Sequence, residues 1–189
     1  MRLTRIRIPR VQPISATPRY DRALRAVAGL LTHLRVSFVF VGSVARAAYL
    51  GERVEQQSID VVAVMAPEQK NQLAMMANNR GFVVNRAELE ATDELDLVPF
   101  EFVDPEGSVR VYVLLATNAL YGRMFADSVQ TNVGNFDVKV PRIEDFAVLL
   151  QLSSDVTALT QVIGSAGFDR SAYNRKVSAI GLREMVIPE

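Results

Sequence analysis

The chain has 189 residues, about half of them apolar, and its 21 lysines and arginines balance 21 aspartates and glutamates. This length and apolar content are enough for one hydrophobic core, so we expect a compact globular protein. The absence of cysteine excludes disulfides and thiolate chemistry, and the single histidine, His33, argues against a histidine-based zinc site. A net charge of zero argues against general attraction to nucleic acid or to an anionic membrane.

The basic N-terminus, residues 1–10, lacks the apolar core of a signal peptide. No segment offers the run of about 18 apolar residues that a membrane span needs. We therefore expect a cytoplasmic protein without a membrane partner. Arg2, Arg5 and Arg7 alternate with apolar residues, which predicts the polar face of an edge strand, with an RNA contact as the alternative.

The first half of the chain alternates helical and strand patterns. Pro18 follows Thr17 at a helix start, and apolar residues then recur at helical spacing. The apolar run that ends at Gly42 is typical of a buried strand entering a tight turn. In chain order we expect a helix at 18–34, a strand at 36–41, a helix at 43–50, a central strand at 59–65, a helix at 67–79 and a strand at 82–84.

The second half predicts two hairpins and a helical end. Residues 88–96 are acidic and indicate an irregular surface segment, while the residue pair Gly134-Asn135 is a two-residue hairpin signal. We expect strands at 99–103 and 109–115, a helix at 118–125, strands at 129–133 and 136–140, and helices at 143–152, 155–163 and 170–180. The prediction is an α+β protein with a mixed sheet, in which a body at 1–141 and a helical extension at 142–189 form one structural unit.

One strand, turn, helix and strand carry the residues with chemical potential. Gly42 permits close backbone approach, and Ser43 at a helix start offers amide and hydroxyl donors to a phosphate. On the next strand, Ser58 and Asp60 occupy alternate positions, so their side chains share one face of the sheet. Two acids so placed would hold magnesium, which needs oxygen ligands. Here only Asp60 is an acid.

This layout resembles the nucleotidyltransferase superfamily, in particular its abortive-infection toxin and minimal nucleotidyltransferase-like branch, over residues 36–163. The resemblance implies a nucleotidyltransferase-like mixed sheet flanked by helices, with a C-terminal helical segment. It implies that Ser58 and Tyr112 stand at positions of metal-binding acids, that Gln151 stands at a lysine position, and that Arg53 contacts phosphate. Gly42, Ser43 and Asp60 match the family's chemical positions.

The leading hypothesis is a nucleotidyltransferase-fold protein with an eroded metal site, which binds a nucleotide or a partner with weak or no catalysis. Removing one well-placed electrostatic stabiliser costs about 3 kcal/mol, or roughly 10²–10³ in rate. Asp60 alone would hold magnesium weakly, with water and nucleotide phosphates as the other ligands.

Two alternatives remain open at this stage. An active enzyme would use Mg²⁺ and a nucleoside triphosphate to transfer a nucleotide to an acceptor hydroxyl, with Glu52, Glu55 or Glu101 replacing a missing acid. A toxin–antitoxin-type interaction protein would instead bind a protein partner or a second copy through its helical end or its basic N-terminus.

Overall fold

The computed structural model describes residues 11–54 and 58–182. Predictions that concern Arg2, Arg5, Arg7 and Glu55 lie outside these residues. The helices are α1 (Pro18–His33), α2 (Gly42–Leu50), α3 (Lys70–Asn79), α4 (Arg86–Ala91), α5 (Ala119–Ala126), α6 (Ile143–Leu152), α7 (Val156–Ile163) and α8 (Arg170–Ala179). The strands are β1 (Phe38–Phe40), β2 (Ile59–Ala63), β3 (Leu97–Asp104), β4 (Gly107–Leu115), β5 (Val129–Val133) and β6 (Phe136–Val140).

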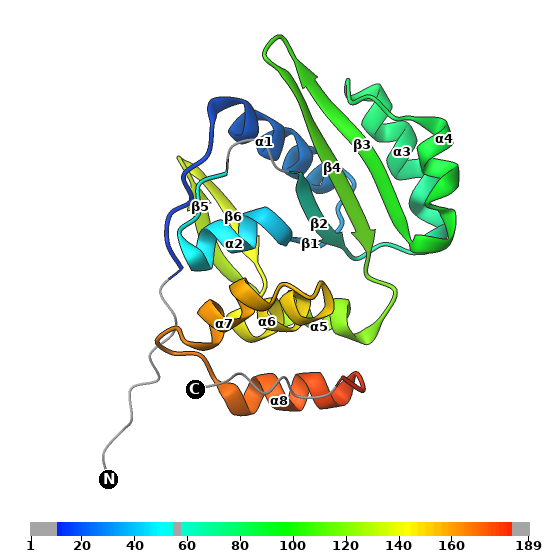
Figure 1. Ribbon diagram of the computed structural model, residues 1–189. Coiled ribbons are helices and arrows are strands. Elements are labelled where there is room, and N and C mark those ends of the chain that lie inside the picture. Colours follow the sequence, from blue (N-terminus) through cyan, green and yellow to red (C-terminus); the bar gives the residue numbers. More distant parts are fainter. Residues whose placement is uncertain (1–10, 55–57, 183–189) are drawn as a thin grey trace.

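Four strands form a mixed sheet in the order β1-β2-β4-β3, and β5 pairs with β6 in a separate hairpin (Figure 1). The β2–β4 pair is parallel, while β1–β2 and β3–β4 are antiparallel. A parallel pair needs a crossover connection, and α3, α4 and β3 lie between β2 and β4 in the chain. The predicted α+β class with a mixed sheet is confirmed.

The two faces of the sheet bury different amounts of apolar surface. Register places Phe40, Val61 and Val113 on one face, and all three are at most 1% exposed. This face belongs to the main core, which includes side chains of α1 and α3. The other face has a smaller cluster, in which Val39 and Val62 pack with Met124 of α5. This second face also carries the polar residues Asp60, Tyr112, Arg110 and Glu101.

Local signals explain where α1 begins. Thr17 is extended and its hydroxyl accepts a hydrogen bond from the main-chain N–H of Tyr20, while Pro18 occupies the first turn. The buried residues of α1, among them Leu24, Val27 and Leu31, follow the spacing that the sequence predicts. The helix therefore presents one apolar stripe to the core.

Three predictions about elements need correction. The acidic segment 88–96, predicted as irregular, overlaps α4, which Asn85 caps by accepting hydrogen bonds from the main-chain N–H groups of Ala87 and Glu88. The strand predicted at 82–84 is a single bridge between Val83 and Glu101. The strand predicted at 36–41 is shorter, since only Phe38–Phe40 pair regularly with β2.

The C-terminal helices lie together below the sheet, with α8 outermost in the view of Figure 1. The fully buried carboxylate of Asp145 on α6 accepts a 2.6 Å hydrogen bond from Nζ of Lys176 on α8. The hydroxyl of Tyr173 donates to Oε1 of Gln151 at 2.6 Å. Polar contacts thus link α8 to α6. The predicted boundary between a body at 1–141 and a helical extension at 142–189 stays a prediction.

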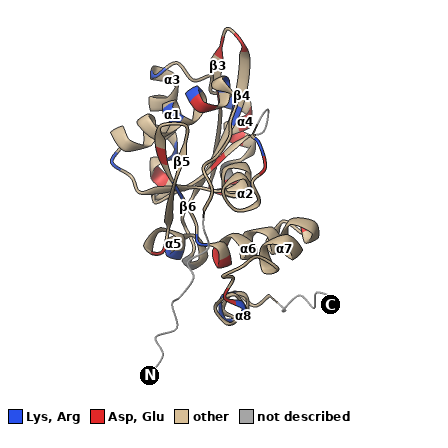
Figure 2. Ribbon diagram, turned by 90° about the vertical axis from the view of Figure 1, so that its left-hand side faces the viewer, with Lys and Arg blue, Asp and Glu red and all other residues tan. Residues whose placement is uncertain are grey.

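Charged residues of both signs are interleaved along the ribbon, with acidic residues at the tip of the β3–β4 hairpin (Figure 2). Arg22 of α1 bonds to Asp104 at this tip at 2.6 Å, which ties the hairpin to the helix. Among the helices of residues 11–54 and 58–182, none combines the length and apolarity needed to cross a bilayer.

Candidate functional site

The Gly42–Ser43 turn lies directly against Asp60. The main-chain N–H of Val41 donates to the carbonyl of Asp60 at 2.8 Å. The turn that follows β1 therefore lies next to β2. Gly42 has φ +51°, and a Cβ at this position would collide with Oδ2 of Asp60. Glycine is needed here for both its backbone conformation and its lack of a side chain. The carboxylate and the start of α2 are consequently in contact.

Asp60 is half-buried, and the hydroxyl of Ser58 donates a 3.0 Å hydrogen bond to its Oδ1. Burial raises the pKa of Asp60, and the hydrogen bond from Ser58 partly opposes that rise. The residue at the first acid position thus interacts with Asp60 as a neutral donor. A second carboxylate in that place would repel Asp60 unless a cation lay between them.

Tyr112 lies beside Asp60, as the sequence predicts. The two residues are directly opposite each other in the parallel β2–β4 pair, so their side chains point to the same face of the sheet. Pro99 of β3 is opposite Tyr112 in the antiparallel β3–β4 pair. The structure thus brings together Asp60, Ser58 and Tyr112, the three positions at which the resemblance implies metal-binding acids.

The hydroxyl of Ser43 points into the protein rather than toward a ligand. It lies 2.8 Å from the hydroxyl of Tyr20 and 2.7 Å from the carbonyl oxygen of Ser58, and the Tyr20 hydroxyl lies 3.2 Å from the same carbonyl. Whichever hydroxyl donates to the other, the single proton of Ser43 is used within this triangle. Burial raises the pKa of Tyr20 well above its usual range, so its hydroxyl stays protonated. At the turn, main-chain amides are left as donors to an anion.

The loop between α2 and β2 is held by ion pairs. Arg46 of α2 binds Glu52 through two hydrogen bonds, of 2.9 and 2.7 Å, and also pairs with Asp155 at the start of α7. Arg53 follows in this loop and is exposed. Glu52, one of the predicted replacement acids, therefore has an arginine partner.

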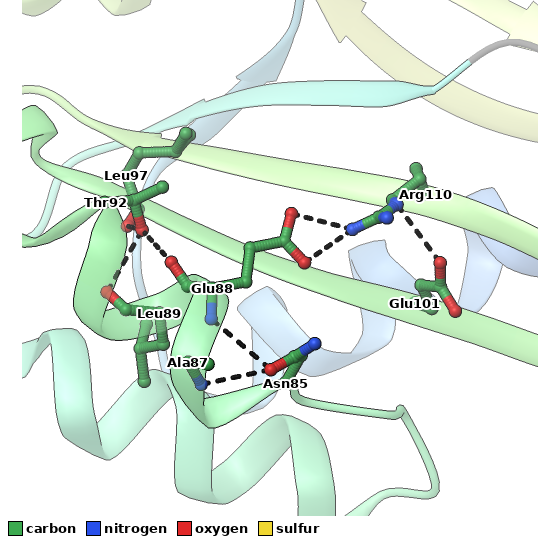
Figure 3. Close-up of polar contacts among 8 residues, drawn as sticks. All are labelled: Asn85, Ala87, Glu88, Leu89, Thr92, Leu97, Glu101 and Arg110. Carbon is green, nitrogen blue, oxygen red and sulfur yellow. Dashed lines mark hydrogen bonds and ion pairs between the residues drawn. The ribbon is translucent and has the colours of Figure 1, made fainter.

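Glu101, another predicted replacement acid, also pairs with an arginine (Figure 3). Its Oε1 lies 3.1 Å from Nε of Arg110 on β4, and Nη1 of Arg110 contacts both carboxylate oxygens of Glu88 at 2.7 and 2.6 Å. Glu101 and Arg110 are opposite each other in the β3–β4 pair, on the face that also carries Tyr112. Two acids from β3 and α4 thus share one guanidinium.

Within residues 11–54 and 58–182, no three acidic or histidine side chains gather closely enough to hold a metal ion. A hard divalent cation needs several oxygen ligands, and Asp60 is the one carboxylate of the Ser58, Asp60 and Tyr112 group. The predicted weak metal site at Asp60 stays a prediction.

Comparison with solved structures identifies the architecture. The crystal structure of an antigenic nucleotidyltransferase-like protein from Paracoccidioides brasiliensis aligns with a TM-score of 0.57 over 89% of this chain and 89% of that chain, at 14% sequence identity. The chain has a nucleotidyltransferase-like fold. No protein-family model matches the sequence, and no curated protein does. At this level of identity the nucleotidyltransferase-like likeness establishes the fold alone.

Several residues of this site were not anticipated from the sequence. Tyr20 lies on the apolar stripe of α1 with Leu24 and Val27, and a buried tyrosine there implies a partner for its hydroxyl. That signal was present, but the partner, 23 residues away, was not predictable. Arg46 and Arg110 carried no local signal, because their partners come from other elements.

Proposed function

We propose that this protein binds a nucleotide at the Gly42–Ser43 turn and transfers it poorly or not at all. The observation that carries the proposal is the group of side chains around Asp60. Ser58 donates a hydrogen bond to its carboxylate, and Tyr112 lies opposite it on the adjacent strand. A hydroxyl and a phenol thus stand at two positions where the resemblance implies metal-binding acids.

The surroundings of Asp60 favour a protein without a firmly bound divalent ion. Glu52 and Glu101 are each neutralised by an arginine, which leaves them poor candidates to complete a magnesium site. Mg²⁺ fits these side chains badly, so no catalytic step through it is derived.

The start of α2 supports binding. The first amides of a helix have no intrahelical acceptor and carry partial positive charge, so they attract phosphate. Arg53 is exposed and lies in the loop that follows this helix. These features suit the phosphates of a nucleotide.

A transfer assay tests the proposal. Purified protein would be incubated with α-labelled nucleoside triphosphates, Mg²⁺ and acceptors that include RNA, protein and small alcohols. We expect no label transfer above the level of Asp60→Ala, while calorimetry with ATP or GTP detects binding. Magnesium-dependent transfer that Asp60→Ala abolishes would establish an active nucleotidyltransferase and refute the proposal.

A further inference from the structure

The first turns of α1 and α2 and the start of β2 meet at one buried hydroxyl, that of Tyr20. The Tyr20 side chain is fully buried, and its oxygen lies 2.8 Å from the hydroxyl of Ser43 and 3.2 Å from the main-chain carbonyl oxygen of Ser58. The Ser43 hydroxyl lies 2.7 Å from the same carbonyl oxygen. Ser58 directly precedes β2. A single phenol from α1 thus connects the start of α2 with the start of β2.

The start of α1 is itself fastened to the loop that follows α2. The main-chain N–H of Thr17 donates to the carbonyl of Val54 at 3.2 Å, and the N–H of Val54 donates to the carbonyl of Ser15 at 3.0 Å. Pro18 and the cap at Thr17 fix the direction of the first turn of α1. Tyr20 lies in that first turn, so its hydroxyl projects from a backbone that has little freedom to move.

The Gly42–Ser43 turn is held from two sides. Oδ2 of Asp60 lies where a Cβ of residue 42 would be, and the Tyr20 hydroxyl contacts the side chain of Ser43. Closely packed groups transmit a displacement to their neighbours. A change at Tyr20 therefore shifts the first residues of α2, whose main-chain N–H groups have no acceptor within the helix.

The hydroxyl of Ser43 serves this contact rather than a ligand. Ser43 is 6% exposed, and its one hydroxyl proton is directed at Tyr20 or at the carbonyl of Ser58. A serine hydroxyl has a single proton to donate, so it does not donate to a phosphate while it donates inward. Ser43 is therefore expected to act on a ligand through its main-chain N–H.

We propose that Tyr20 is a positioning residue for phosphate binding, which acts through Ser43 to set the direction of the first N–H groups of α2. The inference rests on the proposed function, because it concerns the same turn. It adds a buried side chain of α1 to the residues on which recognition of a phosphate depends. The phenol itself stays inside the protein and holds the turn.

The test is calorimetric titration of the full-length protein and of Tyr20→Phe with ATP and with inorganic pyrophosphate. The substitution removes only the phenol oxygen. We expect the variant to bind both ligands about tenfold more weakly, the effect of one misaligned hydrogen bond to a charged group. The loss should be the same for ATP and for pyrophosphate, because only the groups that face the phosphates move.

Tyr49→Phe is the matched control. Tyr49 lies in the last turn of α2, and its hydroxyl donates to the carbonyl of Pro141 at 2.6 Å. This variant also removes the hydroxyl of a tyrosine that contacts α2, but at the end of the helix away from the turn. Urea unfolding should show a lower midpoint in both variants, whereas Tyr49→Phe should bind both ligands within about twofold of the wild type.

The double variant Tyr20→Phe/Ser43→Ala shows whether the two hydroxyls act together. We expect its loss of affinity to be smaller than the product of the two single losses, because both hydroxyls hold the same turn. Unchanged affinity in Tyr20→Phe, an equal loss in Tyr49→Phe, or the full product of losses in the double variant would overturn the role of Tyr20 and leave the proposed function standing. No binding of either ligand by the wild type would overturn both.

Discussion

Asp60 is an acid whose ionised form the fold disfavours. Its pKa is raised by burial, so between its unfolded and folded pKa values the native state holds more protons than the unfolded chain. Stability consequently falls as the pH rises through that window and then levels off. This is the behaviour expected of a buried carboxylate.

Replacing this acid by a neutral isostere should therefore stabilise the protein. Asp60→Asn keeps an acceptor for the hydroxyl of Ser58 and removes the buried charge. Urea unfolding over a pH series should show a gain at neutral pH that disappears below the usual range of an aspartate. Asp104→Asn is the matched control with the opposite sign, because the hydrogen bond from Arg22 lowers the pKa of Asp104. A loss of stability at neutral pH in Asp60→Asn would contradict this account.

The contact between Gly42 and Asp60 gives a second prediction. Gly42→Ala adds the strain of a left-handed residue, about 1–2 kcal/mol, and a collision with the carboxylate. Gly81→Ala adds the strain alone, since no atom lies within 4 Å of its Cβ position. Urea unfolding should show a larger loss at position 42, part of which Asp60→Ala recovers in the double variant. Equal losses at both positions would show that the carboxylate does not press on the turn.

Part of this site was predictable from residue types and spacing. A strand period of two placed Ser58 and Asp60 on one face, and the resemblance identified Tyr112 as their neighbour, which the register agrees with. The role of the Ser43 hydroxyl was not predictable, because it depends on Tyr20 arriving from another helix. Residue spacing determines which side chains share one face of an element. The hydrogen-bond partners of these side chains depend on tertiary contacts, which spacing does not reveal.

Between helices, an ion pair joins Lys176 of α8 to Asp145 of α6. Asp145 is 1% exposed, and its Oδ2 has no hydrogen-bond partner within the described segments. Lys176→Met would leave a buried carboxylate without its cation, at a cost of about 3–5 kcal/mol. Chemical denaturation measures this loss, and the double variant Asp145→Asn/Lys176→Met should recover most of it. A loss below about 1 kcal/mol in the single variant would place the pair among ordinary surface contacts.

The helices and strands were predictable to different degrees. The long helix α1 has a clear helical period, and the β5–β6 hairpin has the turn signal Gly134-Asn135. Both predictions are confirmed. The helix α4 was missed because its six residues are too few to show a clear period. The short β1 was overestimated, since its apolar composition did not reveal that it lies at the sheet edge.

For the chain as a whole, the nucleotidyltransferase-like fold and the proposed eroded metal site have different physical requirements. The fold depends on buried apolar positions in both faces of the sheet, none of which involves the identity of Ser58 or Tyr112. The side chains at positions 58 and 112 can therefore change while this scaffold is kept. Acids placed at both positions should therefore create a metal site without disturbing the fold.

Calorimetric titration of Mg²⁺ into the wild type and into Ser58→Asp/Tyr112→Asp tests this most directly, with Ser58→Asn/Tyr112→Asn as the uncharged control. We predict that the acidic variant binds the ion at least tenfold more tightly than the wild type, a difference of about 1.4 kcal/mol, and that the uncharged variant does not. Tight binding by the wild type, with no gain in the acidic variant, would contradict the proposed erosion of the metal site.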